Sequence, residues 1–274
     1  MSTQNIFENL WTDYITLNPE AKRVHDLVLD EEKRAGRNIS RLENDHVAFR
    51  TYKHSRIGLL TFVKIFEKHG YSVKGEYYFK EKKLYAQHME SKSPDQPRVF
   101  ISELLIENFD SLVAKTCEQV AEAIPNELLT QDRLLWSGRP WQASSETYQT
   151  LMKQSEYAAW VYAFGFRTNH FTVSLNHLKA FSDLTTLNTF LKGKGIPLNT
   201  SGGEIKGSKA VFLEQSSTLA EKVETKFIEK IEKIPSCYYE FAQRFNDSSG
   251  KLFNGFVEGS ADKIFESTYV QKPK

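Results

Sequence analysis

Two segments of the chain decide its fold, because they begin in nearly the same way: Asn44-Asp45-His46-Val47-Ala48-Phe49-Arg50-Thr51 and Asn169-His170-Phe171-Thr172-Val173-Ser174. Each has a histidine at the head of an alternating apolar run, a pattern typical of a half-buried strand. Each is followed by a helical stretch that ends at a glycine, residues 56–70 after the first and 182–195 after the second. The spacing from histidine to glycine is 24 residues in the first copy (46 to 70) and 25 in the second (170 to 195). The pattern predicts an internal duplication of a strand–helix–strands module.

The composition limits the classes of protein to which the chain can belong. A chain of 274 residues buries roughly 75% of its unfolded surface, so we expect a large core in one domain or in two fused halves. The net charge is +1 with mixed signs, which argues against a partner such as nucleic acid. The two cysteines, Cys117 and Cys237, form no disulfide framework and favour a reducing cytoplasm. We expect a cytoplasmic protein without a membrane partner, because neither a signal peptide nor an apolar run of about 20 residues is visible.

The periodicity predicts the order of elements. In the first part we expect helices at 4–17, 19–35 and 56–69, and strands at 44–52, 71–79, 83–90 and 97–107. After the helix of the second module we expect strands at 210–215, 222–229 and 234–241. Between the modules lies a largely helical insertion, in which we expect Trp136, Trp141 and Trp160 to pack against the sheet. The aromatic, glycine-flanked segment 250–256 is either a lid or a packed surface loop.

These elements define the expected fold class, α+β. Two related βαβββ-type modules form a curved mixed sheet around a metal site, with an outer helical layer. We expect a single metalloenzyme domain over the whole chain, 1–274. Its parts are module one at about 44–107, the helical insertion at about 110–164 and module two at about 168–241.

Three side chains are candidate metal ligands. A duplicated module can bring one histidine from each copy, His46 and His170, to a common site. Glu240 lies between Tyr239 and Phe241, and a carboxylate in so apolar a strand is costly unless it is paired or bound to a cation. Two histidines and a carboxylate are the set that holds a non-haem Fe(II) with open positions for substrate and oxygen.

Two alternatives remain open for the acidic residues. An ion pair with Arg244, on the same strand face, would also explain Glu240. Glu103 is a partial counterpart of Glu240 in the first module, so it is either a fourth ligand or a partner for Arg50.

Arg50 is the candidate for substrate binding. It follows His46 by four residues, so both side chains point to the same face of one strand, roughly 13 Å apart. Arg50 would therefore pair with a substrate carboxylate one small molecule away from a metal on His46, a task that suits the planar fork of donors on arginine.

The duplicated module with ligands on facing strands resembles the vicinal oxygen chelate superfamily, which includes glyoxalases and extradiol dioxygenases. A more specific resemblance, to the 2-oxoadipate dioxygenase/decarboxylase (hydroxyglutarate synthase) family, extends from about residue 5 to 269. It is carried by five segments: Asn44-Asp45-His46-Val47-Ala48-Phe49-Arg50-Thr51, Pro97-Arg98-Val99-Phe100-Ile101-Ser102-Glu103-Leu104, Asn169-His170-Phe171-Thr172, Val211-Phe212-Leu213-Glu214-Gln215-Ser216-Ser217-Thr218 and Ile234-Pro235-Ser236-Cys237-Tyr238-Tyr239-Glu240-Phe241.

The resemblance implies an activity and a site. His46, His170 and Glu240 would bind Fe(II), and Arg50 would hold the substrate. The enzyme would use O₂ to decarboxylate a 2-oxo acid and to hydroxylate the shortened acid in place, converting 2-oxoadipate, an acid of lysine catabolism, to 2-hydroxyglutarate and CO₂. Further candidates for substrate contacts are Lys83, Glu103, Gln215 and Arg244.

Two other classes of function remain open. One is a glyoxalase-like isomerase or lyase that uses Zn²⁺, Ni²⁺ or Mn²⁺ as a Lewis acid. The other is a ligand-binding protein without catalysis, against which the intact set of His46, His170 and Glu240 argues. The sequence leaves the oligomeric state and the identity of the oxo acid open.

Overall fold

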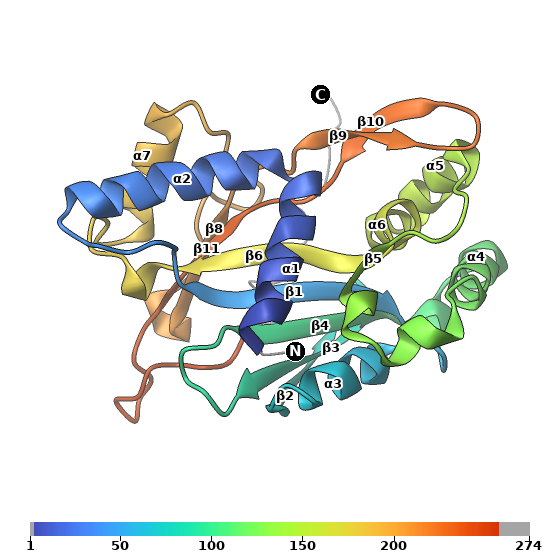
Figure 1. The fold of residues 1–274 in the computed structure, drawn as a ribbon, viewed down its shortest axis with the longest axis horizontal. Coiled ribbons are helices and arrows are strands. Elements are labelled where there is room, and N and C mark those ends of the chain that lie inside the picture. Colours follow the sequence, from blue (N-terminus) through green and yellow to red (C-terminus); the bar gives the residue numbers. More distant parts are fainter. Residues whose placement is uncertain (1–2, 258–274) are drawn as a thin grey trace.

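The fold is a curled sheet of nine strands with helices packed on it, seen in a computed structural model that describes residues 3–257 (Figure 1). The helices are α1 (Thr3–Leu17), α2 (Pro19–Arg34), α3 (Leu59–Glu67), α4 (Ser111–Glu122), α5 (Ser145–Gln154), α6 (Glu156–Phe164) and α7 (Leu184–Gly193). The strands are β1 (Asn44–Tyr52), β2 (Tyr71–Phe79), β3 (Leu84–Ser91), β4 (Arg98–Leu104), β5 (Trp136–Gly138), β6 (Phe166–Ser174), β7 (Lys206–Ser208), β8 (Leu213–Ser217), β9 (Lys222–Lys226), β10 (Ile231–Pro235) and β11 (Glu240–Arg244).

The strand order confirms the duplication. The sheet runs β2-β3-β4-β1-β6-β11-β8-β7, with β5 paired to β6. In the first half β1 pairs in parallel with β4, and in the second half β6 pairs in parallel with β11. The remaining pairs of each half are antiparallel, and β1 meets β6 in an antiparallel pair at the centre. Each half is therefore a βαβββ module, with α3 or α7 after its first strand.

The central pair shows the symmetry residue by residue. His46 of β1 lies opposite Thr172 of β6, and Ala48 lies opposite His170. If the two modules are exchanged, the pair of His46 with Thr172 becomes the pair of His170 with Ala48, so the two histidines occupy equivalent positions. Because side chains two residues apart share a face of a strand, both histidines point to the same face of the sheet.

The opposite face of the sheet forms the apolar core. Phe49 of β1 packs on Phe62 and Phe66 of α3, with ring centroids 5.9 and 5.5 Å apart. Phe171 of β6 packs on Trp11 of α1 at 5.3 Å, and α1 lies across this face in Figure 1. Burial of each such aromatic ring contributes about 2–3 kcal/mol. Because side chains alternate along β1 and β6, the face that carries the histidines points away from these helices, toward the inside of the curled sheet.

Two of the predicted strands are wrong in their placement. Residues 222–229 and 234–241 were expected to extend the second module, but β9 and β10 pair only with each other. About half of their residues are exposed, because this hairpin lies beside the main sheet. The fourth strand of the module is β11, which begins at Glu240. The strand predicted at 210–215 lies at 213–217, whereas the insertion is largely helical as predicted, with α4, α5 and α6.

A glycine holds β5 against the start of β6. Gly165 has a positive φ of 83°, and a Cβ atom there would lie 1.9 Å from the carbonyl oxygen of Gly138. We expect Gly165→Ala to lower the free energy of unfolding by at least about 2 kcal/mol, because it combines backbone strain with a backbone clash. Urea denaturation measures the effect. Gly193→Ala is the control, since nothing lies within 4 Å of its added methyl group; a similar loss in both variants would contradict the argument.

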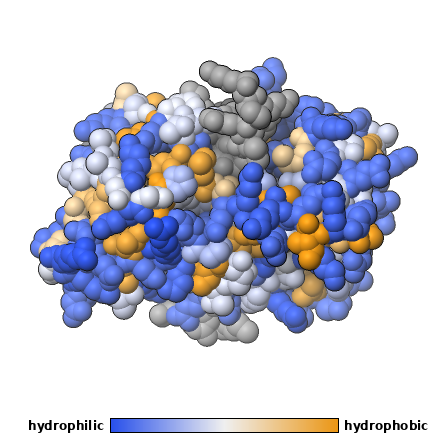
Figure 2. Space-filling view, turned by 90° about the horizontal axis from the view of Figure 1, so that it is seen from above, coloured by the Kyte–Doolittle hydropathy of each residue, from blue (hydrophilic) through white to orange (hydrophobic). Residues whose placement is uncertain are grey.

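The surface has no large apolar face in the view of Figure 2. Hydrophilic residues predominate there, and apolar residues form small separate patches. Among residues 3–257, no helix combines the length and the apolar character that crossing a bilayer requires.

Candidate metal centre

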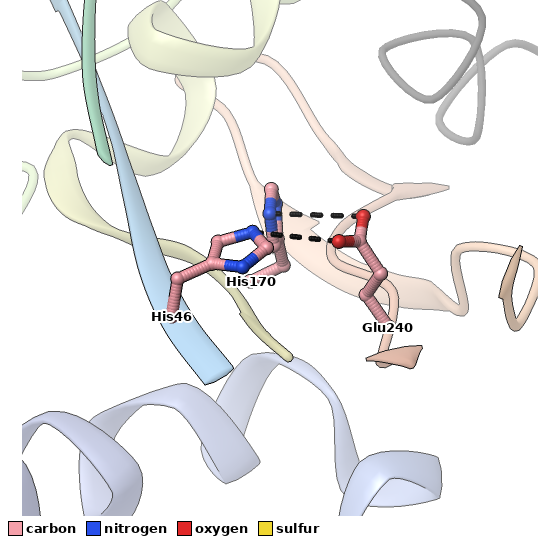
Figure 3. A group of neighbouring side chains, drawn as sticks. All are labelled: His46, His170 and Glu240. Atoms are coloured by element: carbon pink, nitrogen blue, oxygen red, sulfur yellow. Dashed lines mark ion pairs between the residues drawn. The ribbon is translucent and has the colours of Figure 1, made fainter. Parts of the chain in front are cut away.

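The structure brings His46, His170 and Glu240 together from three neighbouring strands (Figure 3). Nε2 of His46 lies 3.4 Å from Oε1 of Glu240, and Nε2 of His170 lies 3.9 Å from Oε2. One ligand atom from each residue lies within 4.8 Å of the other two. All three side chains are buried.

Strand pairing explains this convergence. Thr172 of β6 lies opposite His46 on one side and beside Glu240 on the other. Paired residues in adjacent strands project to the same face of a sheet. His170 lies two residues before Thr172 and shares that face as well.

The environment of Glu240 fits a bound cation. Oε1 accepts hydrogen bonds from Nε2 of Gln215 at 2.7 Å and from Oγ1 of Thr172 at 3.1 Å. Oε2 is buried, and within residues 3–257 no group donates a hydrogen bond to it. A buried carboxylate oxygen without a donor is costly unless a cation binds it. We therefore expect a metal ion at this site, with bonds of about 2.0–2.2 Å to the imidazole nitrogens and to the carboxylate oxygen.

Burial shifts the protonation of two ligands in opposite senses for metal binding: it favours the protonated acid of Glu240 and the neutral imidazole of His170. It raises the pKa of Glu240, partly offset by His46. Burial also lowers the pKa of His170 well below its usual value, and the charges of His46 and Arg50 add to this effect. His170 is therefore neutral, the form that binds a metal. A cation would in turn stabilise the carboxylate of Glu240.

Each histidine is oriented by the residue that precedes it. Nδ1 of His46 lies 2.8 Å from Oδ1 of Asp45, and Nδ1 of His170 lies 3.0 Å from Oδ1 of Asn169. Each Nδ1–H donates to that oxygen, which leaves Nε2 for a metal. The sequence analysis missed both partners. The signal was the side-chain oxygen that precedes the histidine in each copy.

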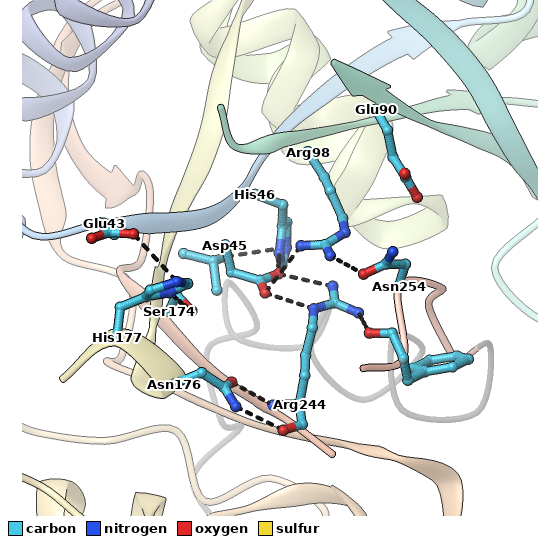
Figure 4. Close-up of polar contacts among 12 residues, drawn as sticks. Glu43, Asp45, His46, Glu90, Arg98, Ser174, Asn176, His177, Arg244 and Asn254 are labelled. Carbon is cyan, nitrogen blue, oxygen red and sulfur yellow. Dashed lines mark hydrogen bonds and ion pairs between the residues drawn. The ribbon is translucent and has the colours of Figure 1, made fainter. Parts of the chain in front are cut away.

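Asp45 is also the partner of Arg244 (Figure 4). Nε and Nη2 of Arg244 donate to its two oxygens at 2.6 and 2.8 Å, and Nη1 of Arg98 lies 3.5 Å away. Burial opposes the charge of Asp45, but Arg244 and His46 hold its pKa well below the usual value. The alternative pairing of Arg244 with Glu240 is therefore wrong, because the guanidinium is already committed to Asp45.

Arg50 lies in the wall of the same cavity as the metal cluster. The cavity has a volume of about 30 Å³, and its other lining residues include Phe100, Ser102, Gln215, Tyr238 and Phe256. Nη1 of Arg50 donates to Oε1 of Glu156 at 3.0 Å. The guanidinium stacks over the rings of Tyr157 and Trp160, 5.0 and 5.3 Å from their centroids. These contacts position Arg50 beside the cluster; its substrate role stays a prediction.

The first module has no counterpart of Glu240. Glu240 pairs with Thr172, and the equivalent pair in the first half joins Phe100 to Ala48. Glu103 lies three residues after Phe100 and faces the other side of the sheet. There its Oε2 accepts a hydrogen bond from the first backbone N–H of α3 at 2.8 Å. Glu103 is therefore neither a ligand of this cluster nor a partner of Arg50, and its capping role explains its burial.

The other predicted substrate contacts divide into two groups. Gln215 lines the metal cavity, as expected for a residue that touches the ligands. Lys83 lies in a separate surface pocket, where its Nζ donates to the carbonyl of Asn108 at 2.7 Å. Arg244 does not line the metal cavity either, because it reaches away to Asp45.

The segment 250–256 packs over the cluster. The ring of Phe256 lies 4.8 Å from the ring of His46, edge to face. Nη1 of Arg244 donates to the carbonyls of Phe253 and Gly255 at 3.1 and 2.7 Å. The end of this segment is therefore a packed wall of the metal cavity, held by the same arginine that holds Asp45.

We expect Asp45→Asn to weaken both the metal site and the fold. The amide no longer neutralises buried Arg244, which should cost about 3 kcal/mol of unfolding free energy, and metal affinity should fall about 10- to 100-fold. Because the pKa of Asp45 is lowered by folding, its contribution is present above about pH 4 and is lost as the pH falls through the folded pKa. Urea denaturation at neutral and acidic pH measures this. An equal effect of the substitution at both pH values would contradict it.

Comparison with known proteins identifies relatives of the whole chain. A family model described as 2-oxoadipate dioxygenase/decarboxylase matches residues 6–251. The chloroplastic 2-oxoadipate dioxygenase/decarboxylase of Arabidopsis thaliana is 34% identical over 98% of this chain and 78% of its own length.

Solved structures agree with this relationship. The hydroxyglutarate synthase of Oryza sativa, crystallised with 2-oxoadipate, superposes with a TM-score of 0.84 at 29% identity, over 96% of this chain and 91% of that one. A Shewanella frigidimarina protein, solved under the provisional name of a hydrolase, gives a TM-score of 0.88 at 44% identity, over 93% of this chain and 97% of that one. A protein from Ralstonia eutropha assigned to the glyoxalase superfamily, at 20% identity, shares the fold with a TM-score of 0.68 over 91% and 86% of the two chains. The predicted fold class is thereby confirmed.

Proposed function

The chain belongs to the 2-oxoadipate dioxygenase/decarboxylase family, and from this we propose that it binds Fe(II) and oxidatively decarboxylates and hydroxylates a 2-oxo acid, with 2-oxoadipate as substrate. One observation carries the proposal: two histidines and a glutamate converge in the cavity that Arg50 also lines. We further propose that the chain acts as a single metalloenzyme domain. The sequence predicts that this domain covers 1–274, of which 1–2 and 258–274 lie outside the described residues.

The overall reaction balances without a second co-substrate. 2-Oxoadipate and O₂ give 2-hydroxyglutarate and CO₂, so the 2-oxo acid supplies all the electrons that reduce O₂. Fe(II) held by two histidines and one carboxylate would supply the oxygen chemistry and would keep positions open for substrate.

The residues of this chain hold the donor set in place. Gln215 and Thr172 hold Oε1 of Glu240 and leave Oε2 for the cation. Asp45 and Asn169 direct Nε2 of both histidines to the same point. The hydrogen bonds to Nδ1 of both histidines and to Oε1 of Glu240 thus leave Oε2 of Glu240 for the metal, and Nε2 of His46, which also lies 3.1 Å from Oγ1 of Thr172, would exchange that contact for the metal.

Arg50 would select the substrate by its distal carboxylate. Its guanidinium is buried and rigidly stacked, so little side-chain entropy is lost on binding. A monocarboxylic oxo acid has no distal carboxylate to pair with this guanidinium, so its binding free energy would be weaker by a few kcal/mol. A dicarboxylic acid that reaches from the metal to Arg50 would therefore be preferred.

The test is anaerobic loading with Fe(II), followed by a screen of 2-oxo acids for O₂ uptake and CO₂ release. We expect 2-oxoadipate to consume O₂ and to release CO₂ in equal amounts. Turnover with Zn²⁺ or Ni²⁺ in the absence of O₂ would instead indicate a glyoxalase-like enzyme. Binding of oxo acids without turnover under any condition would indicate a protein that only binds its ligand.

A further inference from the structure

Tyr238 brings an unused hydrogen-bond donor into the metal cavity. The side chain is 0% exposed and lines the cavity together with His170 and Glu240. Its ring stacks on the ring of His170, with centroids 4.7 Å apart and planes at 25°. Within residues 3–257 its hydroxyl has no hydrogen-bond partner. A buried phenol that lacks a partner is costly, so a ligand that accepts its hydrogen bond would gain affinity.

The backbone around Tyr238 fixes the direction of its side chain. Its carbonyl accepts a hydrogen bond from the hydroxyl of Tyr14. The next residue, Tyr239, exchanges hydrogen bonds with Thr218 through both its backbone groups. Tyr239 points to the other face, where its hydroxyl lies 3.1 Å from Nδ1 of His25. Tyr238 and Tyr239 therefore point to opposite sides, and Tyr238 faces the metal cavity.

Tyr238 shares its cavity with Arg50 as well as with the metal cluster. It therefore lies near the space that a molecule bound to both the metal and Arg50 would occupy. The other aromatic residues of the cavity wall, Phe100 and Phe256, have no hydroxyl. Stacking on His170 would not require a hydroxyl either, so packing alone does not explain the hydroxyl of Tyr238.

We propose that the Tyr238 hydroxyl donates a hydrogen bond to an oxygen at the metal-chelating end of the 2-oxo acid. Tyr238 is then a substrate-binding residue that orients the chelate between the two histidines and Arg50. This inference rests on the proposed function. A fixed donor at this point favours one of the two ways in which a carboxylate and a keto oxygen can occupy adjacent coordination positions, and so presents the keto carbon in one orientation.

Tyr238→Phe tests the inference, because it keeps the ring stacked on His170 and removes only the hydroxyl. In Fe(II)-loaded protein without oxygen, the visible charge-transfer absorption of the 2-oxo acid chelate gives its dissociation constant. We expect that constant to rise about 10- to 100-fold, and kcat/KM to fall at least as much. Iron affinity should stay at the wild-type level, and thermal stability should be no lower than that of the wild type, because the substitution removes a buried hydroxyl without a partner in residues 3–257.

Tyr239→Phe is the matched control. Its hydroxyl is equally buried and lies one residue away, but it faces His25 on the opposite side of the sheet. We expect this variant to bind and turn over the 2-oxo acid like the wild type. Equal binding by Tyr238→Phe and the wild type would overturn the inference, and so would loss of iron from Tyr238→Phe, since the residue would then act through His170. A wild-type protein that neither binds nor turns over any 2-oxo acid would overturn the proposed function itself.

Discussion

Glu240→Gln should abolish iron binding and yet leave the metal-free protein at least as stable as the wild type. An amide is a poor ligand for Fe(II), so we expect affinity to fall by more than the roughly 100-fold typical of losing an outer partner. The stability effect has the opposite sign. Because burial raises the pKa of Glu240, its charge costs folding free energy above that pKa, and glutamine removes this cost.

Metal analysis after anaerobic Fe(II) loading and thermal unfolding of the metal-free forms measure the two effects. Glu103→Gln is the matched control, because Glu103 is a largely buried glutamate of the same sheet that caps α3 from the other face. It should keep its iron. If Glu240→Gln retained iron, or if Glu103→Gln lost it, the assignment of ligands would be wrong.

Arg50→Lys should lower kcat/KM for 2-oxoadipate by about 2–4 kcal/mol of transition-state binding. Lysine keeps the charge but loses the planar fork and its stacking between Tyr157 and Trp160. Iron affinity should barely change, because Arg50 is not one of the three residues that form the metal cluster. Steady-state kinetics with metal content measured on the same samples tests this.

A substrate comparison separates carboxylate binding from a structural role. For a monocarboxylic 2-oxo acid of the same length, Arg50→Lys should cost far less, because no distal carboxylate is there to lose its partner. Glu156→Gln removes the partner that already holds Arg50 and should not abolish the preference for dicarboxylic acids. An equal loss of kcat/KM for both classes of acid would make Arg50 a structural support of the cavity.

The sequence by itself determined the two histidines and the duplicated module. Alternation within a strand and the spacing from strand to helix are local properties, so His46 and His170 were recognisable in both copies. Glu240 was also recognisable, because a carboxylate flanked by aromatic residues needs a cation or a partner. The side of the sheet that Arg50 faces follows from its distance of four residues from His46.

Only the tertiary structure decided which of the remaining charged residues serve the site. Glu103 looked like a counterpart of Glu240, but the register of β4 places Phe100 at that position. Arg244 shares a strand with Glu240 and nevertheless pairs with Asp45, which lies 199 residues away in the chain. Tyr238 gave no signal, because tyrosine is common in buried strands. Strand register and ion-pair choice depend on contacts between distant segments, and a single sequence does not contain those contacts.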